Sequence, residues 1–264
     1  MDDIERLQHQ LHAQTSGFQA KIARAKHVIE DALTHDVRWY IAFSGGVDST
    51  VVLDMLQRRG QTLDTLWGDD GFDFPETLQF LKDREERHWF TLRRVRSLDP
   101  WRTWCEEMGR PDLAHDPQAL EAWGNPHVWH DTWHTLTRDA GPRGGYDGVF
   151  LGMLASESAT RRMQLKGGTR PLYQVKSEGG MWHCSPLAHF EKRDVWAYIV
   201  ARNIAYNPVY DRLAELGVPL DRRRVAALSC FRVMQYGSHA ILRSGWPELY
   251  NQLASVFPKI REYS

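Results

Sequence analysis

The feature that most constrains this chain is a strand that ends in two glycines and continues at once as a helix. Residues 41–56 read IAFSGGVDSTVVLDML. The apolar, β-branched run before the glycines is typical of a buried strand in a parallel sheet, and the apolar positions after them recur at helical spacing. This order predicts an anion site, because unpaired N–H groups and the positive end of the helix dipole meet at the turn.

Small and polar side chains fill the turn, and they suit a phosphate better than a hydrophobic core. The glycines let the backbone approach an oxygen closely, and the hydroxyls add donors. The sequence is neither the Walker loop nor the pattern G-x-G-x-x-G, so it predicts a different cradle without a built-in lysine. The alternative is a turn that uses glycine only for tightness. The residues expected to hold the phosphate are Ser44, Gly45, Gly46, Asp48, Ser49 and Thr50.

Strands alternate with helices along the chain. Strands are expected at 37–43, 63–70, 90–95 and 148–154, a hairpin at 171–185, and helices at 3–33, 48–57, 75–89, 127–140, 192–203 and 246–257. This alternation predicts an α/β fold, a three-layer, open and mainly parallel twisted sheet flanked by helices. Ligands of such sheets bind beyond the carboxyl ends of the strands, where Ser44, Asp69 and Gly152 are expected.

Charge, cysteine content and hydropathy indicate which partners and which cellular compartment to expect. The chain has 264 residues and a formal net charge of −1, so whole-chain attraction to nucleic acid or to an anionic membrane is not expected. Its cysteines, Cys105, Cys184 and Cys230, are dispersed and odd in number, which argues against a disulfide framework. The N-terminus lacks an apolar signal core, and no run approaches the ~18 apolar residues that span a bilayer. We therefore expect a cytoplasmic protein with no membrane partner.

Several segments in order carry a family resemblance. SGGVDST at 44–50 resembles the SGGxDS loop (the PP-loop) of the adenine-nucleotide alpha-hydrolase-like superfamily, and GDDGFDFPETLQFL at 68–81 resembles the segment D-T-G-x-x-F-P-E-T of phosphoadenosine phosphosulfate (PAPS) reductase-like proteins. GMLASESATRR at 152–162 resembles the family pattern G-x-R-x-x-E-S-x-x-R, with Leu154 in place of the arginine. PLAHFEKRDVWAYI at 186–199 and NPVYDRL at 207–213 complete the series, and most of the former is interpreted as architecture.

The resemblance implies an ATP pyrophosphatase, which converts ATP to AMP and pyrophosphate and activates an acceptor by adenylation for sulfur transfer. ATP and Mg²⁺ are the implied cofactors. Among the family's uses, a chain of this kind most resembles the component of DNA phosphorothioation systems. That comparison implies a sulfur donor, such as a cysteine desulfurase, and a homo-oligomer or a subunit of a complex.

The resemblance also assigns roles and boundaries. The residues implied to serve catalysis are Ser44, Asp48, Arg161 and Cys230, and those implied to hold Mg²⁺ are Asp48 and Asp69. The nucleotide contacts implied beyond the loop are Asp69, Gly71, Gly152, Glu157, Ser158 and Arg161. The implied division is an N-terminal helical segment at 1–34, a nucleotide-binding domain at 35–215 with a Trp- and His-rich insertion at 97–140, and a C-terminal helical extension at 216–264.

Two other functions stay open. One is a sulfonucleotide reductase acting on PAPS or its relative without the 3′-phosphate. Assimilatory reductases of this family carry a nucleophilic cysteine in a segment E-C-G-I/L-H, and residues 246–264 of this chain contain no cysteine. The other is a catalytically silent nucleotide-binding subunit, which Leu154 in place of the family's arginine motivates.

A basic run near the C-terminus bears on the partner. Arg222, Arg223 and Arg224 precede Cys230 and Arg232. This run predicts contact with the backbone of DNA or tRNA. Nearby cations also lower the pKa of a thiol, which makes Cys230 a candidate sulfur carrier. The alternative, which we favour for the cysteine, is a solvated charge run beside a small buried Cys.

Three histidines share one face of the helix expected at 127–140. His127, His130 and His134 stand at i, i+3 and i+7. Such a set suits zinc. It equally suits a partly buried polar seam beside Trp129 and Trp133, and we favour the seam because the usual partner ligands are missing.

Overall fold

The chain forms two compact units in the computed structural model. The first comprises 1–67, 81–93 and 136–207, and the second comprises 68–80, 94–135 and 208–264. The structure describes residues 1, 3–69, 73–97, 102, 105–106, 108–116, 118, 129–130, 144–176, 180–225 and 239–263.

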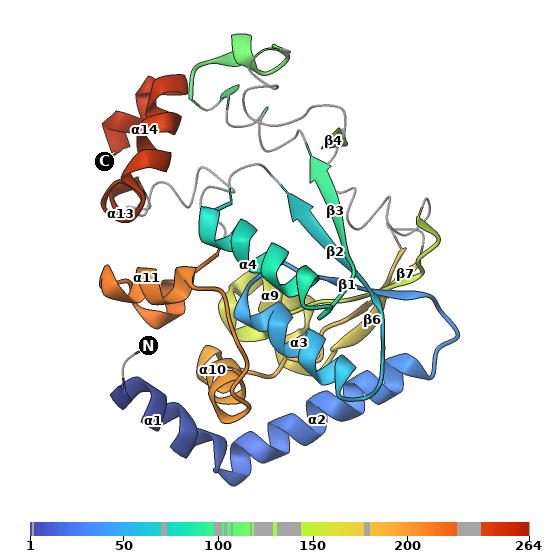
Figure 1. Cartoon of the computed structure of the whole chain (residues 1–264). Coiled ribbons are helices and arrows are strands. Elements are labelled where there is room, and N and C mark those ends of the chain that lie inside the picture. Colours follow the sequence, from blue (N-terminus) through green and yellow to red (C-terminus); the bar gives the residue numbers. More distant parts are fainter. Residues whose placement is uncertain are drawn as a thin grey trace. The chain divides into compact units, whose positions relative to one another are not determined.

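An open sheet organises the fold (Figure 1). Its strands are β1 (Trp39–Ala42), β2 (Asp64–Asp69), β3 (Leu92–Ser97), β4 (Trp129–His130), β5 (Gly148–Phe150), β6 (Leu172–Val175) and β7 (Met181–Cys184). Their order is β4-β3-β2-β1-β5-β7-β6. β1 pairs in parallel with β2 and β5, β5 pairs in parallel with β7, and the hairpin strand β6 runs antiparallel to β7. The predicted α/β fold with a mainly parallel sheet is confirmed.

Helices flank the sheet. The α-helices are α1 (Asp3–Ala13), α2 (Ser16–Leu33), α3 (Val47–Gln57), α4 (Pro75–Glu86), α9 (Ala159–Gln164), α10 (Lys192–Ala201), α11 (Val209–Glu215), α13 (His239–Gly245) and α14 (Pro247–Val256). Short 3₁₀ turns are η1 (Pro111–Leu113), η3 (Ala155–Glu157), η4 (Lys166–Gly168), η6 (Leu220–Arg222) and η8 (Pro258–Tyr263). α1 packs on α10, and α10 packs on α3 (Figure 1).

Local chemistry explains where several helices begin and end. Thr15 separates α1 from α2, and its hydroxyl accepts a hydrogen bond from Phe18 N at 3.3 Å, as an N-cap does. Pro75 opens α4 and Pro247 opens α14, at positions where the missing N–H costs nothing.

One predicted helix is wrong in part. Trp129 and His130 fall within the helix expected at 127–140, yet they form β4 and pair in parallel with Arg96 and Ser97 of β3. Pairing at the edge of the sheet has overridden the local spacing of apolar residues, because a strand edge offers backbone partners that a sequence window does not reveal.

The core of the first unit lies between β1 and the helices that cover it. Tyr40 and Ile41 of β1 are buried, as is Phe150 of β5. Val51 and Leu56 of α3 are fully buried as well. A strand with both faces covered reads as a continuous apolar run, which is how β1 appears in the sequence.

The second unit has its own core. Phe74 packs against Trp246 with ring centroids 4.1 Å apart and the ring planes tilted by 34°, within a cluster that includes Leu253 and Phe257. Glu76 accepts hydrogen bonds from Trp246 Nε1 at 2.8 and 2.9 Å and from Arg212 Nη1 at 2.6 Å. The Phe-Pro-Glu-Thr segment therefore helps to hold this unit together.

A buried carboxylate joins three helices of the first unit. Asp194, at the start of α10, is fully buried and accepts from Lys21 Nζ of α2 at 2.6 Å. His12 Nε2 of α1 lies 2.7 Å from Oδ1, and the Glu191 N–H donates at 2.7 Å to Oδ2, the same oxygen that Lys21 contacts. Burial alone raises the pKa of this carboxyl, but the bonds from Lys21, Glu191 and His12 outweigh it and hold the pKa below its ordinary value.

No helix in the described part of the chain is both long and apolar enough to cross a membrane.

We expect Asp194→Asn to destabilise the chain in a pH-dependent way. A carboxyl whose pKa is lowered by folding stabilises the native state above its unfolded pKa, and this contribution disappears as pH falls through the folded value. The substitution should lower the free energy of unfolding by about 2–4 kcal/mol at pH 7. Urea unfolding of wild type and variant between pH 3 and pH 8 checks this, and the difference should shrink below about pH 4.

The control is Lys82→Gln on the exposed face of α4, which should change stability by less than about 0.5 kcal/mol. An Asp194→Asn variant as stable as wild type at pH 7 would contradict the anchoring role.

Candidate functional site

The glycine turn sits between β1 and α3, as the sequence indicates. Phe43 N donates to Leu66 O at 2.8 Å and so extends the pairing of β1 one residue past the strand. Gly45 has φ of +71°, a left-handed conformation that side chains disfavour. Gly46 is the extended N-cap of α3. The turn therefore places the first N–H groups of α3 directly beyond the end of a central strand.

The hydroxyls of the turn bond mainly to the turn itself. Ser49 Oγ donates to Gly46 O at 3.0 Å, and Thr50 Oγ1 donates to the same carbonyl at 2.9 Å. Both residues are buried. Ser44 is exposed, and its Oγ lies 3.2 Å from Ser49 Oγ and accepts from Gly46 N at 3.3 Å. Ser49 and Thr50 thus shape the cradle, whereas Ser44 stands at its open side.

Gly152 is pressed against the start of α3. A Cβ on this residue would lie 2.7 Å from Ser49 N and 2.8 Å from the carbonyl carbon of Asp48. No side chain fits in that space. Gly152 follows β5 by two residues, so the ends of β1 and β5 meet at the turn, as the topology of a parallel sheet leads one to expect.

A lysine that we did not expect reaches into this cradle. Lys192 Nζ, from the first residue of α10, lies 2.7 and 3.0 Å from the Asp48 carboxylate oxygens and 3.3 Å from Glu157 Oε1. The Lys192, Asp48 and Glu157 side chains are only 12%, 18% and 11% exposed. A distant segment thus supplies the cradle with a lysine. The loop at 44–50 itself contains none, as expected.

A signal for Lys192 was present in the sequence. A lysine in the first turn of a helix opposes the helix dipole, which favours carboxylates there. Such a residue is better explained by a partner outside its own helix. Most of the segment at 186–199 is interpreted as architecture, so Lys192 is not among the predicted site residues.

The third matched segment contributes an ion pair and a helix cap. Arg161 pairs with Glu157, one turn earlier, and its side chain is 42% exposed. Ser158 is the N-cap of α9, and its hydroxyl accepts from Arg161 N at 3.1 Å. Leu154, which replaces the family's arginine, is fully buried in the first unit. The structure thus brings Arg161 to the Asp48–Lys192–Glu157 group and makes Leu154 a core residue.

Asp69 belongs to the second unit. It ends β2, is 1% exposed and forms an ion pair with Arg94 of β3. Its carboxylate therefore already has a cationic partner within its own unit. The magnesium role expected for Asp69 stays a prediction.

The pair of carboxylates at the turn fits a metal ion carried by a nucleotide. Asp48 and Glu157 converge on one cation position, which Lys192 Nζ holds here. Magnesium bound to nucleotide phosphates commonly uses only one or two carboxylates. Within the described ranges, no group of three or more His, Cys, Asp or Glu side chains could hold a metal. A magnesium ion at this position would therefore depend on ligands from the phosphates.

Two of the three cysteines are buried thiols. Burial raises the pKa of Cys105 to about 12 and raises that of Cys184 well above its ordinary value. A thiol that stays protonated is a poor nucleophile. Cys230 lies outside the described residues, as do Gly71, His127 and His134, and of His130 only the backbone is described.

Two arginines of the basic run in the second unit donate hydrogen bonds to nearby backbone carbonyls. Arg223 Nε donates to Val218 O at 2.9 Å, and Arg224 Nη1 donates to Asp221 O at 2.9 Å. Arg222 is exposed. The nucleic-acid contact expected for these residues stays a prediction.

We expect Gly152→Ala to disturb the cradle. The added methyl meets backbone atoms of α3 that cannot move aside without shifting the turn. ATP affinity, measured by isothermal titration calorimetry with Mg²⁺, should fall at least about tenfold, and stability should drop by about 1–3 kcal/mol. Gly17→Ala in α2 is the control, because nothing lies within 4 Å of its Cβ. Wild-type ATP affinity in Gly152→Ala would argue against binding at this turn.

Lys192→Gln should weaken nucleotide binding. It leaves Asp48 and Glu157 as neighbouring carboxylates without their shared cation, and these would repel phosphates. The loss of one charge-assisted contact corresponds to roughly 10–100-fold in the ATP dissociation constant. Lys192→Arg should keep most of the affinity. Tighter ATP binding by Lys192→Gln would mean that the lysine blocks the site.

Comparisons with known proteins agree with this architecture. A family model described as the phosphoadenosine phosphosulfate reductase domain matches residues 38–120 and 144–231. A phosphoadenosine 5′-phosphosulfate reductase of Xanthomonas oryzae pv. oryzae is 28% identical over 216 residues, which cover 80% of this chain and 79% of the relative. The reductase of the same name from Gloeobacter violaceus is 30% identical over 172 residues, 65% of either protein.

A solved structure shares the fold at greater distance. The FMN adenylyltransferase of Candida glabrata superposes with a TM-score of 0.52 at 12% identity, covering 79% of this chain and 66% of that one. At that identity the likeness concerns the fold alone. The family model covers more than half of the chain and includes both the glycine turn and the segment of Gly152 and Arg161. The chain therefore belongs to the phosphoadenosine phosphosulfate reductase domain family.

Proposed function

We propose that this chain is an enzyme that binds an adenine nucleotide with its phosphoryl or phosphosulfate group over the turn at 44–50. The observation that carries the proposal is the close approach of Gly152 to Ser49 N and to Asp48. It joins two strand ends around the start of α3 and leaves the backbone bare of side chains there. The dipole and first N–H groups of α3 attract an anion to this place.

The charged side chains around the turn suit such a ligand. Lys192 and Arg161 bring positive charge to Asp48 and Glu157, so the group is balanced before a nucleotide arrives. A magnesium ion that accompanies the phosphates would find Asp48 and Glu157 at hand and would neutralise charge on the phosphates. Lys192 could then turn toward a phosphoryl oxygen, as lysines do in other phosphate sites.

Two reactions are open to this site, and the relatives favour one of them. The curated relatives reported above carry the name of PAPS reductase. In that reaction a thiolate attacks the sulfur of the phosphosulfate, the nucleotide leaves, and an external dithiol releases sulfite while it is oxidised to a disulfide. The reaction requires a reactive cysteine, and Cys230 is the remaining candidate because Cys105 and Cys184 are buried with raised pKa values.

The other reaction is cleavage of ATP to AMP and pyrophosphate, which needs no reactive cysteine and so is compatible with the burial of Cys105 and Cys184. A substrate oxygen attacks the α phosphorus, the bond to the β-phosphate oxygen breaks, and pyrophosphate leaves. The protein positions the groups and stabilises charge, without a nucleophile of its own. In this case the outer sulfur of a persulfide, carried by a donor such as a cysteine desulfurase, then displaces the adenylated oxygen, which leaves as part of AMP. A thiol reductant breaks the remaining S–S bond to the carrier. DNA or tRNA would be the acceptor, with Arg222 to Arg224 near its backbone.

One experiment separates the two reactions. Purified protein receives either ATP with Mg²⁺ and candidate acceptors, or PAPS with thioredoxin, and the release of pyrophosphate or sulfite is measured. Asp48→Asn should lower either activity by at least about 100-fold, because both need the cradle. Cys230→Ser should abolish sulfite release and leave pyrophosphate release in place if DNA or tRNA accepts directly.

The control is Lys82→Gln on exposed α4, which should leave the turnover of either substrate unchanged. Absence of both products, together with no measurable binding of ATP or PAPS, would contradict the proposed function. Binding without turnover of either substrate would point to the silent subunit instead.

A further inference from the structure

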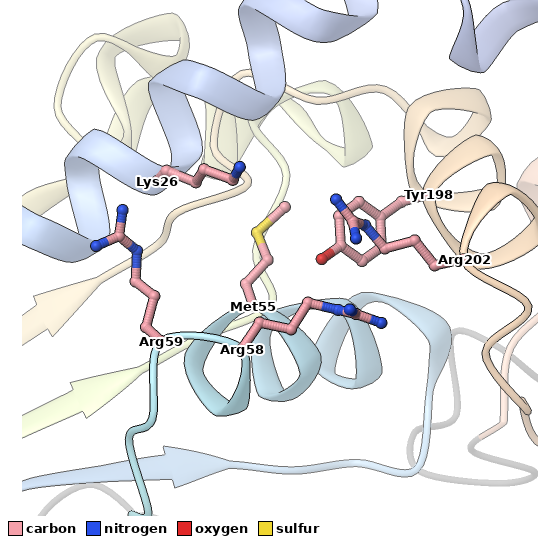
Figure 2. A pocket seen from close by; sticks show the side chains of 6 residues that line it. All are labelled: Lys26, Met55, Arg58, Arg59, Tyr198 and Arg202. Carbon is pink, nitrogen blue, oxygen red and sulfur yellow. The ribbon is translucent and has the colours of Figure 1, made fainter.

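A second hollow lies in the first unit, at the opposite end of α3 from the glycine turn. It measures about 480 Å³ and is lined by Lys26, Met55, Arg58, Arg59, Tyr198 and Arg202. Figure 2 shows that these side chains come from α2, from the end of α3 and the two residues after it, and from α10 and the residue after it, and that they surround one space. We call it the basic hollow. Four of its six lining residues are cations.

Carboxylates balance only part of this charge. Arg58 Nε bonds to Asp54 Oδ2 at 2.7 Å, and Arg59 pairs with Glu30. Lys26 and Arg202 have no carboxylate partner in the described part of the chain. Four cations against two carboxylates leave a surplus of two positive charges around one hollow.

Several of the groups are held in place. Asp54 accepts from the Tyr198 hydroxyl at 2.8 Å as well as from Arg58, so one carboxylate fixes two walls of the hollow. The Arg202 guanidinium lies over the Tyr198 ring, 4.9 Å from its centroid. Long side chains that are already positioned lose less entropy when they bind a ligand.

The surplus matches a phosphate group in sign and size. A phosphate monoester carries about −1.5 to −2 charges at pH 7, and arginine forks bind its oxygens in pairs. Arg58 and Arg59 directly follow the C-terminus of α3. Their positive charges offset the negative end of the helix dipole, which would otherwise repel an anion there. An ordinary solvated charged surface is the simpler explanation for any one of these residues. Cations that converge from three helices on one hollow favour a ligand.

The size of the hollow indicates what carries the phosphate. Met55 and Tyr198 also line it, but they are only 3% and 2% exposed, and the Arg202 guanidinium lies over the Tyr198 ring. Hollows of about 300–1,000 Å³ typically take small molecules. Its walls are mainly cationic, and a hollow of this volume holds a compact phosphate-bearing molecule rather than a long stretch of nucleic-acid strand.

We propose that the basic hollow binds a phosphate group carried on a small molecule of nucleotide size, at a site separate from the glycine turn. The inference does not depend on the proposed function, because none of its residues takes part in the cradle at 44–50. The two ends of α3 would then each face an anion, one at the turn before Val47 and one beside Arg58.

The test uses a full-length protein whose cradle is disabled by Asp48→Asn and Gly152→Ala. AMP, adenosine, inorganic phosphate and a 12-nucleotide single-stranded DNA are titrated by calorimetry. AMP should bind this variant, and Lys26→Gln with Arg202→Gln should weaken it at least about tenfold. Both substituted residues are exposed, so the fold should tolerate the changes, and circular dichroism checks that it does. Lys82→Gln is the matched control and should leave AMP binding unchanged.

The results test binding at the basic hollow independently of binding at the glycine turn. Loss of AMP binding in the cradle variant would overturn the proposal, as would AMP binding that survives the Lys26 and Arg202 substitutions. Adenosine binding as tight as AMP would overturn the role of the phosphate. Binding of the DNA strand, but not of AMP, would overturn the small-molecule ligand and assign the hollow to a nucleic-acid backbone.

Discussion

The rest of the site depends on one steric constraint, which is the contact of Gly152 with the first turn of α3. A Cβ at that position would fall 2.7 Å from Ser49 N. The contact brings the end of β5 against the turn after β1, and the hydroxyls of Ser49 and Thr50 hold that turn closed through Gly46 O. What results is a surface of backbone groups at a helix start, where an anion is favoured and no side chain intervenes.

Charge balance is the second element of the site. Asp48 lies in the first turn of α3, where a carboxylate is favoured by the dipole but would repel a phosphate. The single ammonium group of Lys192, at the start of α10, forms ion pairs with both Asp48 and Glu157. Asp194 in turn fixes the start of α10 through Lys21 and His12. The contacts of Asp194 therefore also position the first turn of α10, from which Lys192 reaches Asp48.

The sequence predicts the parts of this arrangement that are local and misses those that are not. The turn at 44–50 is recognisable because strand, glycines and helix are adjacent. The helix expected at 3–33 is instead two helices, divided at the N-cap Thr15. Lys192 meets Asp48 across 144 positions, so no local pattern could pair them. In the sequence, Leu154 stands where the family pattern has an arginine, which suggests that a phosphate contact has been lost. In the structure Leu154 is fully buried and is a core residue. The strand at Trp129 depends on an edge of the sheet that a helical spacing cannot foresee.

The central claim is that a nucleotide binds with its phosphates at the turn before α3. Amide resonances of the ¹⁵N-labelled protein, followed while ATP with Mg²⁺ is added, test it most directly. The amides of Gly45, Gly46 and Gly152 should shift together, saturate with one dissociation constant, and stay unshifted when adenosine replaces ATP. Saturable shifts confined to other residues, with these three glycines unchanged, would contradict the claim.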